Sequence, residues 1–332
     1  MDTDAGMNGN RPVVVGVDGS RAVPAVVDLA AAEAARRQSP LVIAHVWPGR
    51  YTGYFRGRGS IPARADAQRL LELAESRVRS AHPRLRVRTQ LLDGGAANLL
   101  AEMSVQSRLL VVGHRDDLKA RSGWGPTTAY LAHHSACPLL VHRGRDPGPG
   151  PVVVATSARP EAGATLEYAF SLAEPAAARL VVVHMWTRPG AAEGIPPVVA
   201  AGAYATESAA GERSLDAALA VWLTRYPGVR VERLLVNELD MPYTIEGAMR
   251  RGRLLVAGIG RSGSFAELLY ESWRPAARQR AGCPVLLVPP GWHDAPLRTD
   301  ATAAGGTSPE KRYLGSRKGP STLPLADRPA QR

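Results

Sequence analysis

The sequence is poor in cysteine, in lysine and in long hydrophobic runs, and each shortage excludes a class of protein. Its 332 residues include two cysteines, Cys137 and Cys283, which are too few for a disulfide framework or a tetrahedral zinc site. No apolar run approaches the roughly 18 residues that a membrane helix needs. Residues 1–10 are polar and acidic and lack the order of a secretory signal, so we expect a cytoplasmic protein with no membrane partner.

The net charge of +11 comes from arginine, because only three of the 41 basic residues are lysine. A basic chain raises the question of nucleic acid, which basic domains bind through its phosphates. Here the arginines are spread along the sequence, and no cluster of them alternates with aromatic residues as a base-stacking surface requires. We therefore do not expect a nucleic acid partner.

Motifs for nucleophilic or metal-dependent catalysis are also missing. The sequence has no Walker motif, no zinc motif and no serine–histidine–aspartate pattern of recognised spacing. His133 and His134 are adjacent, so on a helix their side chains point about 100° apart and do not form the pair that a metal prefers. His45 and His184 fall inside predicted strands, and we expect their side chains to face the core or a neighbouring loop. We expect no catalytic residue and no metal site, and a binding protein rather than an enzyme.

What the chain does contain is an internal repeat. Three motifs of the first half recur in the same order in the second half: RPVVVGVDGS (11–20) as GPVVVATSAR (150–159), HVW (45–47) as HMW (184–186), and ACPLL (136–140) as GCPVL (282–286). Preserved order over this length indicates a duplicated domain.

Each copy reads as strands that alternate with helices. Val13–Val17 is an apolar run typical of a strand buried on both faces, and the alanine-rich residues 22–38 have helical periodicity. The remaining strands of the first copy are expected at 41–46, 85–92, 109–113 and 139–141, and its remaining helices at 61–80, 95–106 and 127–134. Alternation of this kind predicts βαβ units and a parallel sheet. The predicted fold class is α/β, with two tandem Rossmann-like domains whose five-stranded sheets carry helices on both faces.

The domain boundaries follow from composition. Residues 11–143 form the first domain and 151–290 the second, and the proline- and glycine-rich residues 144–150 form a linker. In the second domain we expect strands at 152–156, 180–185, 229–236, 254–258 and 285–288, and helices at 161–174, 203–225, 242–250 and 265–280. The low hydrophobicity of residues 1–10 and 291–332 predicts two disordered tails.

Two loops are candidates for a ligand site, because ligands of open parallel sheets bind beyond the carboxyl ends of the strands. After the first strand come Gly16, Val17 and Asp18. The carboxylate of Asp18 can accept hydrogen bonds from a ribose or a base, can hold a metal, or can cap the helix that follows.

The second candidate loop follows the fourth strand. It runs from Val112 and Gly113 to Gly125, Thr127 and Thr128, where a helix is expected to start. Free backbone N–H groups and the helix dipole favour a phosphate at such a start, and threonine hydroxyls add donors. The alternative is that either threonine simply caps the helix.

The combination of VVVGVDGS, HVW, a VVG that ends the fourth strand, and ACPLLV resembles the universal stress protein family. The resemblance covers residues 11–143 and, more loosely, 151–290. It implies flavodoxin-like five-stranded domains, a cytoplasmic location, and dimers or tandem pairs that pack as pseudo-dimers. It also implies an ATP site in some members and none in others.

The family's ATP motif is a glycine, two residues, a second glycine, nine residues, and a glycine followed by serine or threonine. Gly113 and Gly125 match its first and third glycines, but Asp116 replaces the second and Pro126 stands where the hydroxyl residue belongs. Arg115, Lys119 and Arg121 are near enough in sequence to offset the charge of Asp116. The resemblance assigns nucleotide contacts to Gly16, Val17, Asp18, Val46, Val112, Gly113, Gly125, Thr127 and Thr128, with the backbone of Val46 holding adenine.

The second copy departs further from the motif. Ser157 replaces the aspartate, Arg261 replaces the second glycine, although Gly260 and Gly263 are near, and Glu271-Ser272 replaces the final pair. We therefore expect a stress-response regulator that binds at most one ATP, with its Mg²⁺, in the first domain. Two alternatives remain open: a docking protein for unknown protein partners, and a slow ATP hydrolase. The tandem chain could also form a homodimer.

Overall fold

A computed structural model of the chain describes residues 11–47, 63–114, 125–156, 162–186, 201–237, 240–258 and 282–292. The expected disordered tails, apart from residues 291 and 292, and the expected helix at 265–280 lie outside these ranges. Asp116, Ser157, Arg261 and Glu271 lie outside them too. The fold below is that of the described residues.

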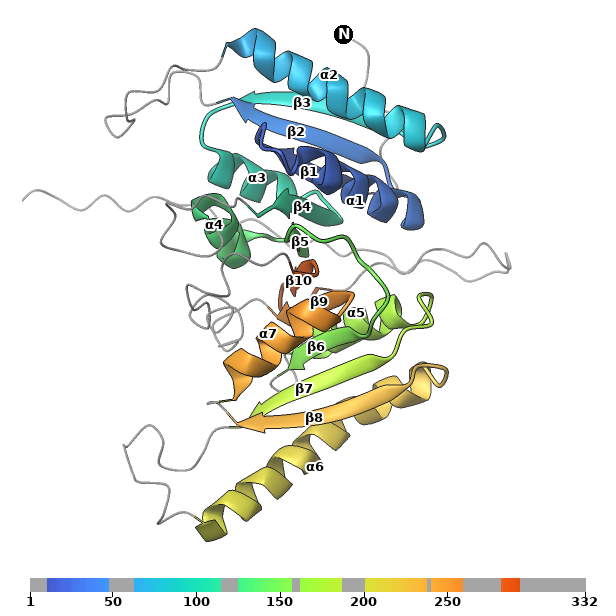
Figure 1. Cartoon of the computed structure of the whole chain (residues 1–332), viewed down its shortest axis with the longest axis vertical. Coiled ribbons are helices and arrows are strands. Elements are labelled where there is room, and N and C mark those ends of the chain that lie inside the picture. Colours follow the sequence, from blue (N-terminus) through green and yellow to red (C-terminus); the bar gives the residue numbers. More distant parts are fainter. Residues whose placement is uncertain are drawn as a thin grey trace, which may run out of the picture. The chain divides into compact units, whose positions relative to one another are not determined.

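The first repeat comprises β1 to β5 and α1 to α4 (Figure 1). Its elements are β1 (Val13–Val17), α1 (Val23–Arg36), β2 (Leu41–Trp47), α2 (Arg64–Ala81), β3 (Val87–Asp93), α3 (Ala96–Ser104), β4 (Leu109–Gly113), α4 (Pro126–His134) and β5 (Leu139–His142). The second repeat comprises β6 (Val152–Thr156), α5 (Gly163–Ala173), β7 (Leu180–Trp186), α6 (Ala201–Arg225), β8 (Val231–Asn237), α7 (Met241–Arg251), β9 (Leu254–Gly258) and β10 (Val285–Val288).

The strands form one sheet in the order β3-β2-β1-β4-β5-β10-β9-β6-β7-β8. Within each repeat all neighbours are parallel, in the order 3-2-1-4-5 of a Rossmann-like half. The two repeats join through their fifth strands, which run antiparallel with Val285 opposite Val141 and Leu287 opposite Leu139. The α/β class and the parallel pairing within each repeat are as the sequence predicted.

Alternate strand residues build two separate cores, one on each face of the sheet. Val13 and Val15 of β1 face α1 and α2, whereas Val14 between them faces the layer that contains Leu100 of α3 and Leu131 of α4. All of these side chains are buried. Burial on both faces explains why the central strands read as continuous apolar runs in the sequence.

The linker contributes a contact that its composition did not reveal. The guanidinium of Arg145 donates hydrogen bonds to three carbonyl oxygens at the end of α7: Arg250 at 2.6 Å, Gly252 at 2.9 Å and Met249 at 3.2 Å. The last carbonyls of a helix have no partner within the helix, and they carry the negative end of its dipole. Arg145 thus ties the linker to the second repeat.

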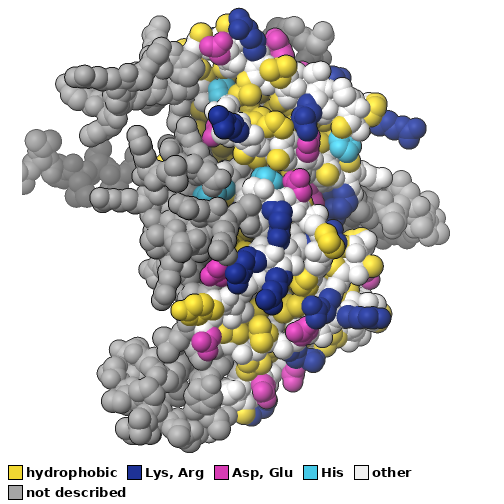
Figure 2. All heavy atoms as spheres, in the orientation of Figure 1, with side chains coloured by type: hydrophobic (Ala, Val, Ile, Leu, Met, Phe, Trp, Pro, Cys, Tyr) yellow, Lys and Arg dark blue, Asp and Glu magenta, His cyan; other side chains and the backbone are white. Residues whose placement is uncertain are grey.

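Charged side chains of both signs share the surface. On the face shown in Figure 2, dark-blue arginine side chains are spread among magenta aspartate and glutamate side chains. Several form ion pairs on the helices, such as Arg77 with Asp28 at 2.6 Å and Arg79 with Glu75 at 2.6 Å. The positive net charge is therefore not gathered into one continuous basic field on this face.

Candidate functional site

The carboxyl ends of β1, β2 and β4 open onto a cavity of about 320 Å³. β1 lies between β2 and β4 in the sheet. The connection after β1 therefore leads to one side of it, to β2, and the connection after β3 leads to the other side, to β4. Such a switch point is where open α/β sheets bind their ligands. The cavity brings together all nine residues that the sequence singled out: Gly16, Val17, Asp18, Val46, Val112, Gly113, Gly125, Thr127 and Thr128.

Asp18 shapes the loop between β1 and α1. One carboxylate oxygen, Oδ1, accepts a hydrogen bond from the backbone N–H of Ser20 at 2.9 Å. The N-cap of α1 is Ala22, and no side chain caps that helix. Asp18 therefore forms a local turn instead of capping α1, and Oδ2 makes no hydrogen bond to the described part of the chain. An exposed carboxylate oxygen at this edge can accept from a ligand hydroxyl or amino group.

The amino end of α4 forms the opposite wall of the cavity. The N-cap is Gly125, with φ of +72°, a backbone conformation that favours glycine, and no side chain caps the helix. Pro126 has no N–H, so the first-turn donors are the backbone N–H groups of Thr127 and Thr128. The hydroxyls of both threonines also make no hydrogen bond within the described residues. The capping alternative therefore does not hold, and unpartnered donors face a space suited to an anion.

Two glycines let helices pack closely around the cavity floor. A Cβ atom on Gly16 would lie 2.9 Å from Cδ1 of Leu100 in α3, and one on Gly113 would lie 3.0 Å from Cγ2 of Val26 in α1. Both distances are shorter than ordinary van der Waals contacts. The glycines thus allow α3 and α1 to pack closely at the switch point.

His45 lines the cavity, although the sequence did not mark it as a site residue. Its Nδ1 lies 2.7 Å from the carbonyl oxygen of Val17, so Nδ1 carries the proton and donates. His184 makes the same contact in the second repeat, to the carbonyl oxygen of Thr156 at 3.0 Å. The signal in the sequence was the recurrence of histidine at one position of both copies.

The second repeat shows only part of the corresponding site. Thr156 ends β6 and is buried, and Gly258 ends β9, where a Cβ atom would lie 3.1 Å from Oγ1 of Thr165. The residues that depart from the motif, among them Ser157 and Glu271, lie outside the described residues, so the expected difference between the repeats rests on sequence. Among the described residues, no cluster of His, Cys, Asp and Glu is suited to a metal ion, and no helix could span a bilayer.

The fold and the site define a class: tandem Rossmann-like α/β domains with a cavity at the switch point of the first. A model of the universal stress protein family matches the sequence twice, at residues 9–143 and 150–289. The chain belongs to the universal stress protein family.

Two curated relatives and one solved structure agree with this assignment. A universal stress protein of Mycolicibacterium smegmatis is 28% identical over 291 residues, which covers 84% of this chain and 97% of the relative. One from Mycobacterium tuberculosis is 30% identical over 283 residues, covering 84% and 96%. The crystal structure of a universal stress protein from Archaeoglobus fulgidus is 14% identical, with a TM-score of 0.55, and covers 85% of this chain and 97% of its own. That structure supports the shared fold.

Proposed function

We propose that the chain is a regulatory binding protein of the stress response that holds one ATP, in its first repeat. The observation that carries the proposal is the cavity itself, which joins the Asp18 loop, the end of β2 and the start of α4 in one space of about 320 Å³. Pockets for small molecules and cofactors typically measure about 300–1,000 Å³, so a nucleoside fits inside while phosphates extend along the rim.

Each part of the nucleotide has a matching part of the cavity. The apolar walls at Ala44 and Val46 suit the base, and the free carboxylate oxygen of Asp18 suits the ribose hydroxyls. The start of α4 offers N–H groups, hydroxyls and the positive end of a helix dipole to the phosphates. Mg²⁺ would arrive with the phosphates, as it commonly does in nucleotide sites. No residue is proposed as catalytic.

The test is equilibrium dialysis with labelled ATP and Mg²⁺ on the full chain and on two variants. Asp18→Ala removes a ligand contact and is expected to weaken binding at least tenfold. Ser157→Ala changes the corresponding position of the second repeat and is expected to leave binding unchanged. If neither the wild-type chain nor the variants bind ATP, a docking protein becomes the better description of the chain.

A further inference from the structure

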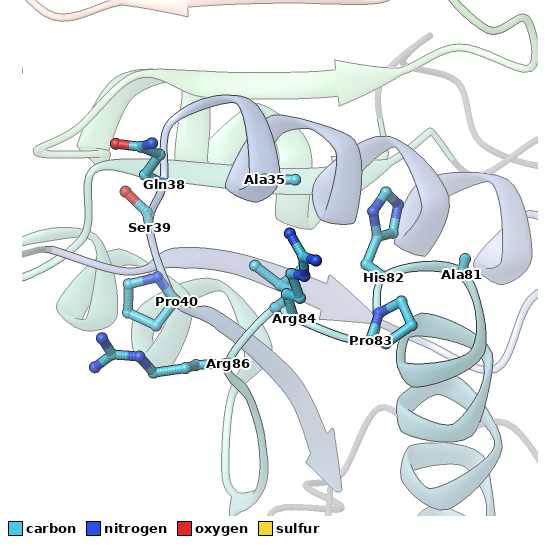
Figure 3. Close-up of a pocket in the computed structure, with 10 residues that line it drawn as sticks. Ala35, Gln38, Ser39, Pro40, Ala81, His82, Pro83, Arg84 and Arg86 are labelled. Carbon is cyan, nitrogen blue, oxygen red and sulfur yellow. The ribbon is translucent and has the colours of Figure 1, made fainter.

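A larger cavity, of about 750 Å³, lies at the opposite end of the strands of the first repeat. It is formed by the turn between α1 and β2 and the turn between α2 and β3 (Figure 3). Its lining consists of Ala35, Gln38, Ser39, Pro40, Ala81, His82, Pro83, Arg84, Leu85 and Arg86. None of the functions discussed above uses this end of the domain.

The charges at this cavity are uncompensated. Its ten lining residues include two arginines and no aspartate or glutamate. Arg84 and Arg86 are exposed, and neither forms an ion pair with the described residues. By contrast, Arg36 on the adjoining helix α1 pairs with Glu33 at 2.7 Å. Two guanidinium groups of one turn are thus available to an external anion, and Figure 3 shows them reaching to different sides of the cavity.

The second repeat provides an internal control, because it keeps the backbone of these turns. The N–H of Leu85 donates to the carbonyl of His82 at 3.0 Å, and the N–H of Val229 donates to that of Tyr226 at 3.2 Å. In the other turn, Gln38 and the corresponding Ala177 both have positive φ, at 52° and 45°. The turn geometry therefore belongs to the fold, and any difference between the two places lies in the side chains.

Those side chains differ in size and in charge. Tyr226 stands in place of His82, and its ring packs 5.5 Å from that of Phe170. Gly228 stands in place of Arg84, and Glu174 in place of Ala35. Arg230 keeps the place of Arg86, so of the two arginines only Arg84 is absent from the second repeat. The turn therefore does not require an arginine at the position of Arg84.

We propose that this cavity binds a small polyanion, a molecule with at least two phosphate or carboxylate groups. The planar guanidinium matches the oxygen geometry of both groups, which makes arginine the usual residue for their recognition. Two separate arginines favour two anionic groups over one. The concave shape and the volume of about 750 Å³ suit a small molecule with an organic body, which Leu85 and the nearby prolines would cover.

The experiment is a calorimetric titration of the full chain with pyrophosphate and, separately, with citrate, which distinguishes phosphate from carboxylate recognition. The double variant Arg84→Gly/Arg86→Gln is expected to weaken binding at least tenfold, or about 1.4 kcal/mol. The single variant Arg84→Gly, which introduces the residue of the second repeat, is expected to account for part of that loss. Because both side chains are exposed, the variants should unfold at the same temperature as the wild type.

A matched control makes the result decisive. Arg88→Gln removes an exposed arginine of β3 outside the cavity lining and should leave pyrophosphate binding unchanged. Equal losses in Arg88→Gln and in the double variant would show non-specific charge attraction and overturn the proposal. It would also be overturned by unchanged binding in the double variant, by no measurable binding of either anion to the wild type, or by tighter binding of an RNA oligonucleotide of equal charge.

Discussion

The ring of His45 and the carbonyl of Val17 meet across β2 and β1, with 2.7 Å between Nδ1 and the carbonyl oxygen. These two residues are also register partners in the sheet. The contact therefore fixes the last residue of β1, which is the residue immediately before Asp18. The loop that we propose contacts the ribose is held from an adjacent strand.

This contact predicts different consequences for two equivalent histidines. His45→Ala and His184→Ala should each lower the free energy of unfolding by about 1 kcal/mol, the usual net value of one hydrogen bond. Only His45→Ala should weaken ATP binding, because only its loop carries the aspartate. Denaturant unfolding and ATP titration of both variants check this. Equal effects on ATP affinity would contradict a positioning role for His45.

Arg145 is expected to be the most important residue of the linker for stability. Arg145→Ala removes three hydrogen bonds to the end of α7 and should lower the free energy of unfolding by about 1.5–3 kcal/mol, the range for hydrogen bonds to charged groups. Arg145→Lys keeps the charge but lacks the forked guanidinium that reaches three carbonyls. It should therefore retain only part of the stabilisation that Arg145 provides. Arg251→Ala, an exposed position on the same helix, serves as the matched control, with a change expected below about 0.5 kcal/mol. Denaturant unfolding measures all three.

Gly125 is expected to be needed for its backbone conformation and not for space. A Cβ atom would meet nothing within 4 Å, but φ is +72°. Gly125→Ala should therefore cost about 1–3 kcal/mol of stability and disturb the start of α4, with weaker ATP binding. Gly148→Ala also meets nothing within 4 Å and has no positive φ, so it should cost far less. Similar losses in the two variants, measured by thermal unfolding, would refute this explanation.

The two thiols are expected to be unreactive in the folded protein. Burial raises the pKa of Cys137 to about 12 and that of Cys283 to about 11, from an ordinary value of 9.0. Since the thiolate is the reactive form, alkylation at pH 8 should be slow until denaturant is added. The unfolded chain loses these protons first, so stability should fall as the pH rises above 9. Rapid alkylation of the native protein, counted by mass spectrometry, would contradict this prediction.

The sequence predicted the sheet because its signals are local. The apolar run Val13–Val17 marks a strand buried on both faces without reference to any other part of the chain. The site was predictable for a related reason: in a parallel sheet, residues that end neighbouring strands meet at one edge, so Asp18 and Gly113 had to lie close together.

The features that the sequence did not predict depend on distant partners. Leu85 was expected to be the first residue of the third strand, but the strand begins at Val87. Leu85 lies instead in a turn, where its backbone N–H donates to the carbonyl oxygen of His82. The partners of Arg145 lie more than 100 residues further along the chain. The basic cavity likewise needs two turns that are about 45 residues apart in the sequence, at Ser39 and Arg84.

Calorimetric titration of the full chain with ATP and Mg²⁺ tests the central claim most directly, because it counts sites as well as measuring affinity. We predict one ATP per chain, and tighter binding by Asp116→Gly, which removes a carboxylate and restores the glycine of the family motif. Two equivalent sites per chain would contradict the assignment to the first repeat. The absence of binding heat in both the wild type and Asp116→Gly would contradict ATP binding altogether.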